Sequence, residues 1–141
     1  MATATKAKPF RLLGSKSETS KHVHEAILAG LPFATLARFL KHYKASGDAI
    51  LESLSIDPKR LALRKASGKL TLEESNRFYR LANLLALATE LYEGDAAGAL
   101  TWLNSPARSL SGDTPFQRAR TEVGAREVEN LIGRLEHGVF S

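Results

Sequence analysis

One apolar helical segment, residues 71–92, constrains the fold more than any other part of the sequence. Thr71 followed by Glu74 is a capping box, which predicts a helix start, and Gly94 predicts the helix end. The apolar residues between them fall on two neighbouring stripes, Phe78, Leu81, Leu85, Ala88 and Tyr92 on one and Leu84, Leu87 and Leu91 on the other. A helix that is apolar over so much of its circumference is buried on more than one side. We therefore expect it either to join two halves of the chain or to form a dimer contact.

Shorter helices are predicted on both sides of this segment. Their start signals are Ser17 or Thr19, Pro32 as a first helical residue, Asp57 with Pro58, Asp95, Thr114 with Pro115, and Thr121. The last helix is expected to place Val123 on one apolar face with Val128 and Leu131. No segment shows the strict apolar-polar alternation of a half-buried strand, so the predicted fold class is all-α.

Charge divides the chain into unequal halves. The 141 residues carry a formal net charge of +5, but residues 1–70 carry +8 and residues 71–141 carry −3. All nine lysines lie in the first half. This asymmetry suggests two surfaces with different partners, one of them a polyanion such as nucleic acid. Residues 1–16 are expected to form a flexible basic arm, which either contacts a minor groove or is an inert tail.

The sequence offers little for catalysis, metal binding or membrane insertion. The absence of cysteine excludes disulfides, thiolate metal sites and thiol nucleophiles, and is compatible with a reducing cytoplasm. His22 and His24 are two residues apart, which points them to different sides of a helix. No apolar run suits a signal peptide or a membrane span. We expect a soluble, cytoplasmic protein that is not an enzyme, with no catalytic residue, metal site or cofactor.

Residues 49–66 have the pattern of two short helices joined by a tight turn. Such a helix-turn-helix lays its second helix in the major groove of DNA. The apolar residues Ile50, Leu54, Ile56 and Leu61 suit contacts between the two helices. The candidate contacts to phosphates or base edges are Lys59, Arg60, Arg64, Lys65 and Lys69. A basic helical hairpin without any DNA-binding role would show a similar pattern, and that alternative stays open.

The chain ends with two bulky apolar residues, Val139 and Phe140, beyond Gly138. A terminus is usually polar, so an apolar tip either folds back onto its own chain or enters a partner. If the last helix covers residues 121–136 it is about 24 Å long, enough to carry the tip far from the helix start.

Three stretches of the second half resemble one known family. They are residues 99–106 (ALTWLNSP), residues 110–115 (LSGDTP) and residues 124–141 (GAREVENLIGRLEHGVFS). These stretches resemble the C-terminal toxin-binding domain of Xre/ParS-type antitoxins, which accompany RES-domain toxins. Residues 70–92 also resemble the central helix of that family.

The resemblance implies an all-α antitoxin that forms a homodimer. It implies an Xre-like helix-turn-helix domain at residues 17–70, which represses its own operon by binding operator DNA, joined by the long central helix to a toxin-binding domain at residues 71–141. The partner would be a RES-domain toxin that consumes NAD, blocked at its active site by the C-terminal segment. The implied toxin contacts are Arg126, Asn130, Arg134, Glu136, His137, Gly138, Val139, Phe140 and Ser141. A stand-alone helix-turn-helix transcription regulator remains the alternative.

Overall fold

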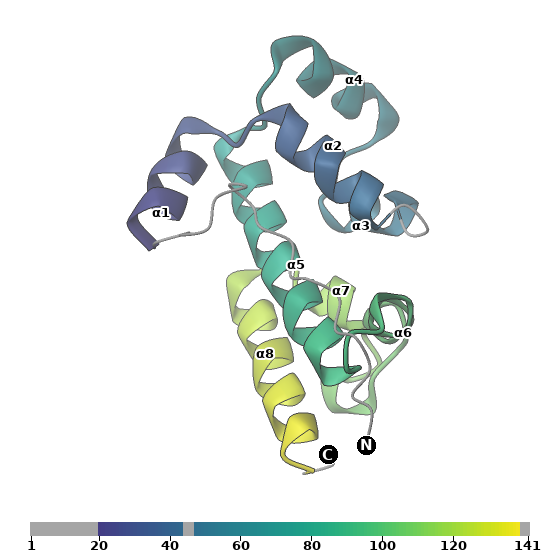
Figure 1. Cartoon of the computed structure of the whole chain (residues 1–141). Helices are drawn as coiled ribbons and strands as arrows, with labels where there is room; N and C mark the ends of the chain where they lie inside the picture. The colour runs from purple at the N-terminus through teal and green to yellow at the C-terminus, as the bar shows by residue number, and fades with distance from the viewer. Residues whose placement is uncertain (1–19, 44–46, 139–141) are drawn as a thin grey trace. The chain divides into compact units, whose positions relative to one another are not determined.

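The computed structural model describes residues 20–43 and 47–138, and these residues form helices and turns (Figure 1). The elements are α1 (Ser20–Ala29), α2 (Phe33–His42), α3 (Gly47–Ser53), α4 (Pro58–Ser67), α5 (Leu72–Leu91), α6 (Ala96–Leu103), η2 (Arg108–Leu110), α7 (Pro115–Arg118) and α8 (Glu122–Glu136). No strand occurs within these two ranges, which confirms the all-α prediction. None of their helices is long and apolar enough to cross a membrane.

The described residues form two compact units. The N-terminal unit extends to Tyr79, and the C-terminal unit begins at Arg80. Helix α5 contributes residues 72–79 to the first unit and residues 80–91 to the second. The boundary expected from the sequence lies between residues 70 and 71, before this helix.

The N-terminal unit has its own apolar core. The buried residues include Val23, Ile27, Leu31, Leu36, Phe39, Tyr43, Ile50, Leu54, Ile56, Leu70 and Phe78. At its centre the rings of Phe39 and Phe78 pack edge to face, with 5.0 Å between ring centroids. Burying large aromatic rings in this geometry contributes more than area alone, so this pair anchors α2 on the start of α5.

Backbone pairing fixes the segment before α2 against the segment before α5. The amide of Phe33 donates to the carbonyl of Gly68 at 2.9 Å, and the amide of Leu70 donates to the carbonyl of Leu31 at 2.9 Å. The buried hydroxyl of Ser75 accepts from the Leu31 amide at 2.9 Å. Gly30, with φ +86°, lies so close that an added Cβ would meet the Leu70 carbonyl oxygen at 2.5 Å. Gly30 therefore both follows the end of α1 and makes a tertiary contact.

The residues predicted to form a helix-turn-helix lie in α3, a four-residue turn and α4. Ser55 takes the left-handed conformation in the turn, with φ 59°. The side chain of Asp57 caps α4 by accepting from the Arg60 amide at 2.7 Å, as predicted. Gly68 ends α4 in a left-handed conformation. Of the expected apolar contacts, Ile50, Leu54 and Ile56 are buried, and Leu61 is half-buried.

The C-terminal unit packs α6, α7 and α8 around residues 80–91 of α5 (Figure 1). Its buried residues include Leu81, Leu84, Leu85, Ala88, Leu100, Leu103, Leu110, Phe116, Val128, Leu131 and Ile132. Thr114 and Gln117 form a capping box at the start of α7. Gly124 lies against the backbone of Arg118, where an added Cβ would collide with the Arg118 carbonyl oxygen. This close approach brings α8 against α7.

Three details differ from the expectations drawn from the sequence. Val123 is 74% exposed, so its predicted place on the buried face of the last helix is wrong. Val123 lies outside the arc of α8 that carries the buried Val128 and Leu131. Pro32 is the N-cap of α2 and not its first residue. Tyr92 follows the end of α5 and is 36% exposed, whereas Ala88 on the same stripe is fully buried.

Residues 1–19 lie outside the described residues. The basic arm at residues 1–16 and the caps Ser17 and Thr19 therefore stay predictions.

Candidate functional site

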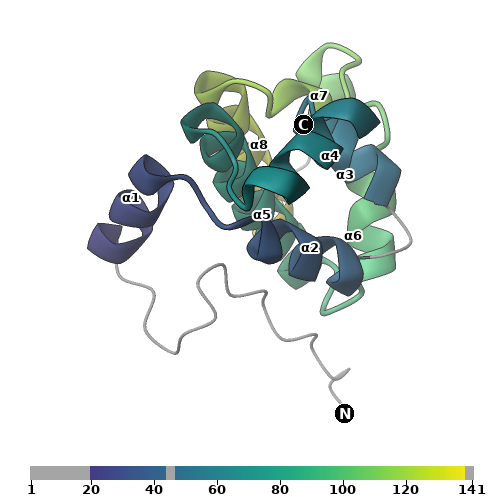
Figure 2. The same cartoon turned by 90° about the horizontal axis from the view of Figure 1, so that it is seen from above.

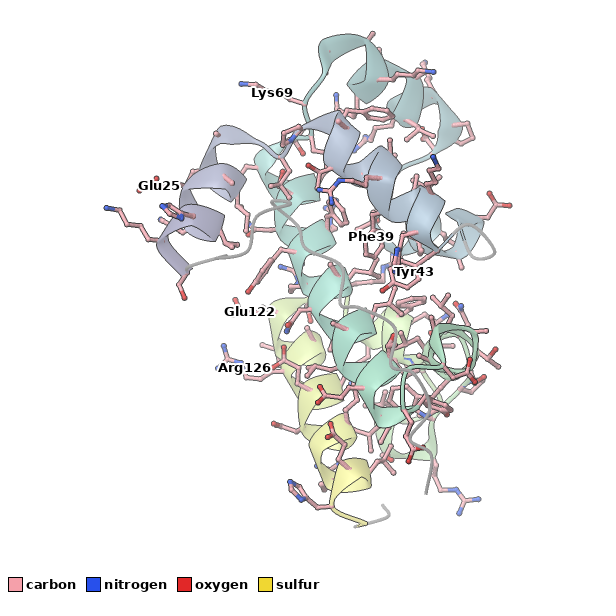
Figure 3. All side chains as sticks on the ribbon, in the orientation of Figure 1. Glu25, Phe39, Tyr43, Lys69, Glu122 and Arg126 are labelled. Atoms are coloured by element: carbon pink, nitrogen blue, oxygen red, sulfur yellow. The ribbon has the colours of Figure 1, made fainter. Side chains whose placement is uncertain are left out.

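The first candidate surface is α4 with the loop that follows it. This helix lies at the top of the N-terminal unit in Figure 1 and faces the viewer in Figure 2, and it contains no buried residue. Four of the five predicted DNA contacts are exposed, namely Lys59, Arg60, Lys65 and Lys69. Lys69 projects from the loop between α4 and α5 in Figure 3. The structure therefore gathers these four cations on one helix and its C-terminal loop.

Arg64, the fifth predicted DNA contact, is turned toward α5. Its Nε donates to Oε1 of Glu74 at 2.7 Å, and the Glu74 side chain is 1% exposed. The same carboxylate oxygen accepts from the Thr71 amide at 2.9 Å, and the Thr71 hydroxyl accepts from the Glu74 amide at 3.1 Å. The predicted capping box is confirmed. Its carboxylate also ties α4 to the start of α5.

The ion pair controls the charge of Glu74. Burial by itself raises the pKa of this carboxyl group, but the hydrogen bonds from Arg64 and Thr71 and the Arg64 charge outweigh burial. The net result is a Glu74 pKa below the ordinary value of 4.5, so the group is ionised at neutral pH. A charged acceptor of this kind holds a guanidinium strongly. Because α4 buries no apolar side chain, this pair is a main attachment of its C-terminal half.

The second candidate surface is the exposed side of α8. Asn130 and Arg134 lie four residues apart and are both exposed, as are Glu136, His137 and Gly138 at the helix end. Arg126 is paired with Glu122 at 3.1 Å, and both side chains are at least 70% exposed. Figure 3 shows these two side chains extending from α8. Val123, which was expected in the core, lies on the same exposed side of the helix.

Polar contacts hold α8 in place from two directions. The guanidinium of Arg118 lies 3.2 Å from an Asp113 carboxylate oxygen and 3.5 Å from Glu127. On the other side, the Asn83 amide donates to the Glu129 carboxylate at 3.2 Å. These contacts join α8 to the loop before α7 and to α5. These contacts fix α8 along the two edges of its exposed side.

The predicted toxin contacts at the very end of the chain are Val139, Phe140 and Ser141. These three residues lie outside the described part of the chain, which ends at Gly138. Gly138 has φ +75°, a conformation that ends a helix.

Sequence reasoning missed two features of these surfaces. The capping pattern predicts the local role of Glu74, but the ion pair of Glu74 with Arg64 depends on tertiary contact across ten residues. Leu63 is 56% exposed on α4, although its apolar character alone gave no sign of exposure. The helical phase relative to Leu61 could have placed Leu63 on the outer side.

Known proteins resemble this chain over both units. Residues 87–138 match the family described as the antitoxin Xre/MbcA/ParS C-terminal toxin-binding domain. A protein named "Antitoxin Xre" from Photorhabdus laumondii is 34% identical over 134 residues, covering 94% of this chain and 90% of its own length.

A second "Antitoxin Xre", from Yersinia enterocolitica, is 42% identical over 93 residues, which cover 65% of this chain. That match spans 63% of the Yersinia protein, a little under two thirds of its length. A third, from Pseudomonas putida, is 36% identical over 69 residues. The nearly full-length similarity to the Photorhabdus protein, together with the domain match that includes α6, α7 and α8, shows that the chain belongs to the Xre family of antitoxins.

Proposed function

We propose that this chain is the antitoxin of a type II toxin-antitoxin system and neutralises a RES-domain toxin that consumes NAD. The observation that carries the proposal is the match of residues 87–138 to a toxin-binding domain. This match covers α8 and ends at Gly138, an exposed residue just beyond the helix. In this proposal the toxin contacts Arg126, Asn130, Arg134 and the end of α8, and residues 138–141 occupy its active site. NAD chemistry belongs to the toxin, and this chain is not an enzyme.

Deletion of residues 138–141 tests the occlusion mechanism. These residues follow α8, so the core residues of the C-terminal unit are unchanged and thermal unfolding should remain close to that of the intact chain. Cells that express the toxin with the truncated chain should lose NAD and stop growing, whereas the intact chain should protect them. Protection by a truncated chain that still folds would contradict occlusion.

We further propose that the chain represses its own operon as a homodimer in the cytoplasm. The exposed cations of α4 and its loop would contact phosphates, and a dimer would place two copies of α4 about 34 Å apart for palindromic half-sites. Two half-buried leucines of α5, Leu87 and Leu91, are available for a dimer contact. A stand-alone transcription regulator is the second candidate. It would be favoured by the absence of a toxin gene beside this one.

Replacement of Arg60 by Ala tests the DNA-binding role of α4. The loss of one phosphate contact should reduce the slope of log affinity against log salt concentration by about one unit. The matched control is Arg126→Ala, which removes the same charge from an exposed side chain of the C-terminal unit. Gel shifts with the DNA upstream of the gene measure both. Equal salt dependence for Arg60→Ala and the intact chain would contradict the assignment of α4.

A further inference from the structure

The outward side of α4 differs from the side that faces its own unit. Leu61 is half-buried and Arg64 is bound to Glu74, so these two residues define the inner side. The opposite side carries Lys59, Ala62, Leu63 and Ala66, which recur at the spacing of one helical face and are all exposed. The residues that project farthest from the N-terminal unit are therefore mostly apolar.

This apolar strip lies inside a basic frame. Leu63 is 56% exposed, and the two alanines beside it leave the helix backbone accessible to a close partner. Lys59 begins the strip, Arg60 and Lys65 flank it, and Lys69 follows in the loop. Lys59 belongs to the strip itself, and lysine is depleted from the cores of protein-protein interfaces, which disfavours a protein partner. Four cations around a short apolar strip are complementary to a polyanion that displays apolar groups between its charges.

DNA has this combination in its major groove. Phosphates border the groove, and the 5-methyl group of thymine is the apolar group on the base edges. Alanine and other apolar side chains on a recognition helix discriminate thymine by contact with this methyl group. We propose that Leu63, with Ala62 and Ala66, reads thymine methyl groups in the operator while the surrounding cations bind phosphates. This inference rests on the proposed DNA binding by α4 and adds the base that α4 selects.

Replacing thymine by uracil in the DNA provides a direct test, because uracil lacks only the methyl group. The probe is the duplex directly upstream of the gene, prepared with thymine and with uracil, and binding is measured by fluorescence anisotropy. The intact chain should bind the uracil duplex more weakly, by about fourfold for each methyl group that is contacted. A scrambled duplex of the same composition, in both forms, reports any general effect of methyl removal.

Two matched variants assign the effect to α4. Leu63→Ser should weaken binding to the thymine duplex and reduce the difference between the two duplexes, since only Ala62 and Ala66 remain to contact methyl groups. Leu28→Ser is the control, because Leu28 is 59% exposed on α1 of the same unit and the change in side chain is identical. It should keep the full difference between the duplexes.

Three outcomes would overturn the inference. First, the intact chain could prefer the upstream sequence but bind its thymine and uracil forms equally. That result would exclude thymine reading, whereas DNA binding would still stand. The proposed role of Leu63 would also be excluded if Leu63→Ser kept the full difference between the duplexes. If the intact chain does not prefer the upstream duplex to the scrambled one, the proposed operator binding is itself wrong. A difference in sedimentation between Leu63→Ser and the intact chain would then assign the strip to contact between copies of the chain.

Discussion

The buried carboxylate of Glu74 has two tasks, capping α5 and holding Arg64, and substitution measures their combined contribution. Glu74→Ala loses both and leaves a half-buried guanidinium, so we expect a loss of about 2 kcal/mol in the free energy of unfolding. This is below the roughly 3–5 kcal/mol for a fully buried pair, because Arg64 keeps partial contact with water. Glu74→Gln keeps an oxygen acceptor and should lose less. Urea unfolding measures both variants.

Glu73 provides the control, and pH provides a second readout. Glu73 pairs with Arg77 at 3.6 Å and its side chain is 83% exposed, so Glu73→Ala should change stability by less than about 0.5 kcal/mol. The folded pKa of Glu74 lies below its unfolded value of 4.5. Its contribution is therefore fully present above pH 4.5 and is lost as pH falls through the folded pKa. The difference in unfolding free energy between the intact chain and Glu74→Gln should therefore shrink in acid. A difference that stayed constant would refute this account.

Two glycines of α8 should respond in opposite directions to the same substitution. A Cβ on Gly124 would collide with the Arg118 carbonyl oxygen, so Gly124→Ala should destabilise the chain by about 2 kcal/mol or more through displacement of α8 from α7. Gly133 has no neighbour within 4 Å of an added Cβ, so Gly133→Ala should stabilise α8 by about 0.5–1 kcal/mol. Thermal unfolding of both variants distinguishes packing from helix propensity. A similar change in both would mean that α7 and α8 do not approach as described.

At the scale of single elements, helix starts were the most predictable feature. Asp57, Asp95, Thr114 and Thr121 all cap the helices that the sequence assigned to them. Each cap depends on a side chain and a backbone amide two or three residues away, so the information is local. The predicted stripe of Leu81, Leu85 and Ala88 on α5 is buried for a similar reason, since helical periodicity fixes which residues share a face.

Features that depend on contacts between elements could not be predicted in this way. The hydrogen bond between Leu31 and Ser75 joins residues 44 positions apart, and no local pattern marks it. Val123 was expected in the core because it is apolar, but its phase on α8 places it on the outer side. Arg64 was predicted to face DNA with its neighbours, and the carboxylate that turns it toward α5 lies on another helix. The basic character of α4 could be predicted from the sequence. Its outward apolar strip could be identified only once the side of α4 that faces the rest of the N-terminal unit was known.

At the scale of the whole molecule, the division of charge predicts that its two proposed interactions respond differently to salt. Residues 1–70 carry +8, and the exposed Lys59, Arg60 and Lys65 lie on α4, so operator binding should release many counterions. If six or more phosphates are contacted, affinity should fall by about a thousandfold or more between roughly 50 and 200 mM salt.

Toxin capture should be much less sensitive over the same range. Residues 71–141 carry −3, and the proposed anchor at the chain end is the apolar pair Val139 and Phe140. Apolar burial is not screened by salt, and exposed side-chain charges such as Arg126 contribute little to begin with. We expect less than about a tenfold change in toxin affinity, measured by titration calorimetry with a catalytically inactive toxin. Toxin and DNA affinities that fell in parallel would mean that one electrostatic surface serves both partners, and the assignment of α4 and α8 to separate tasks would be wrong.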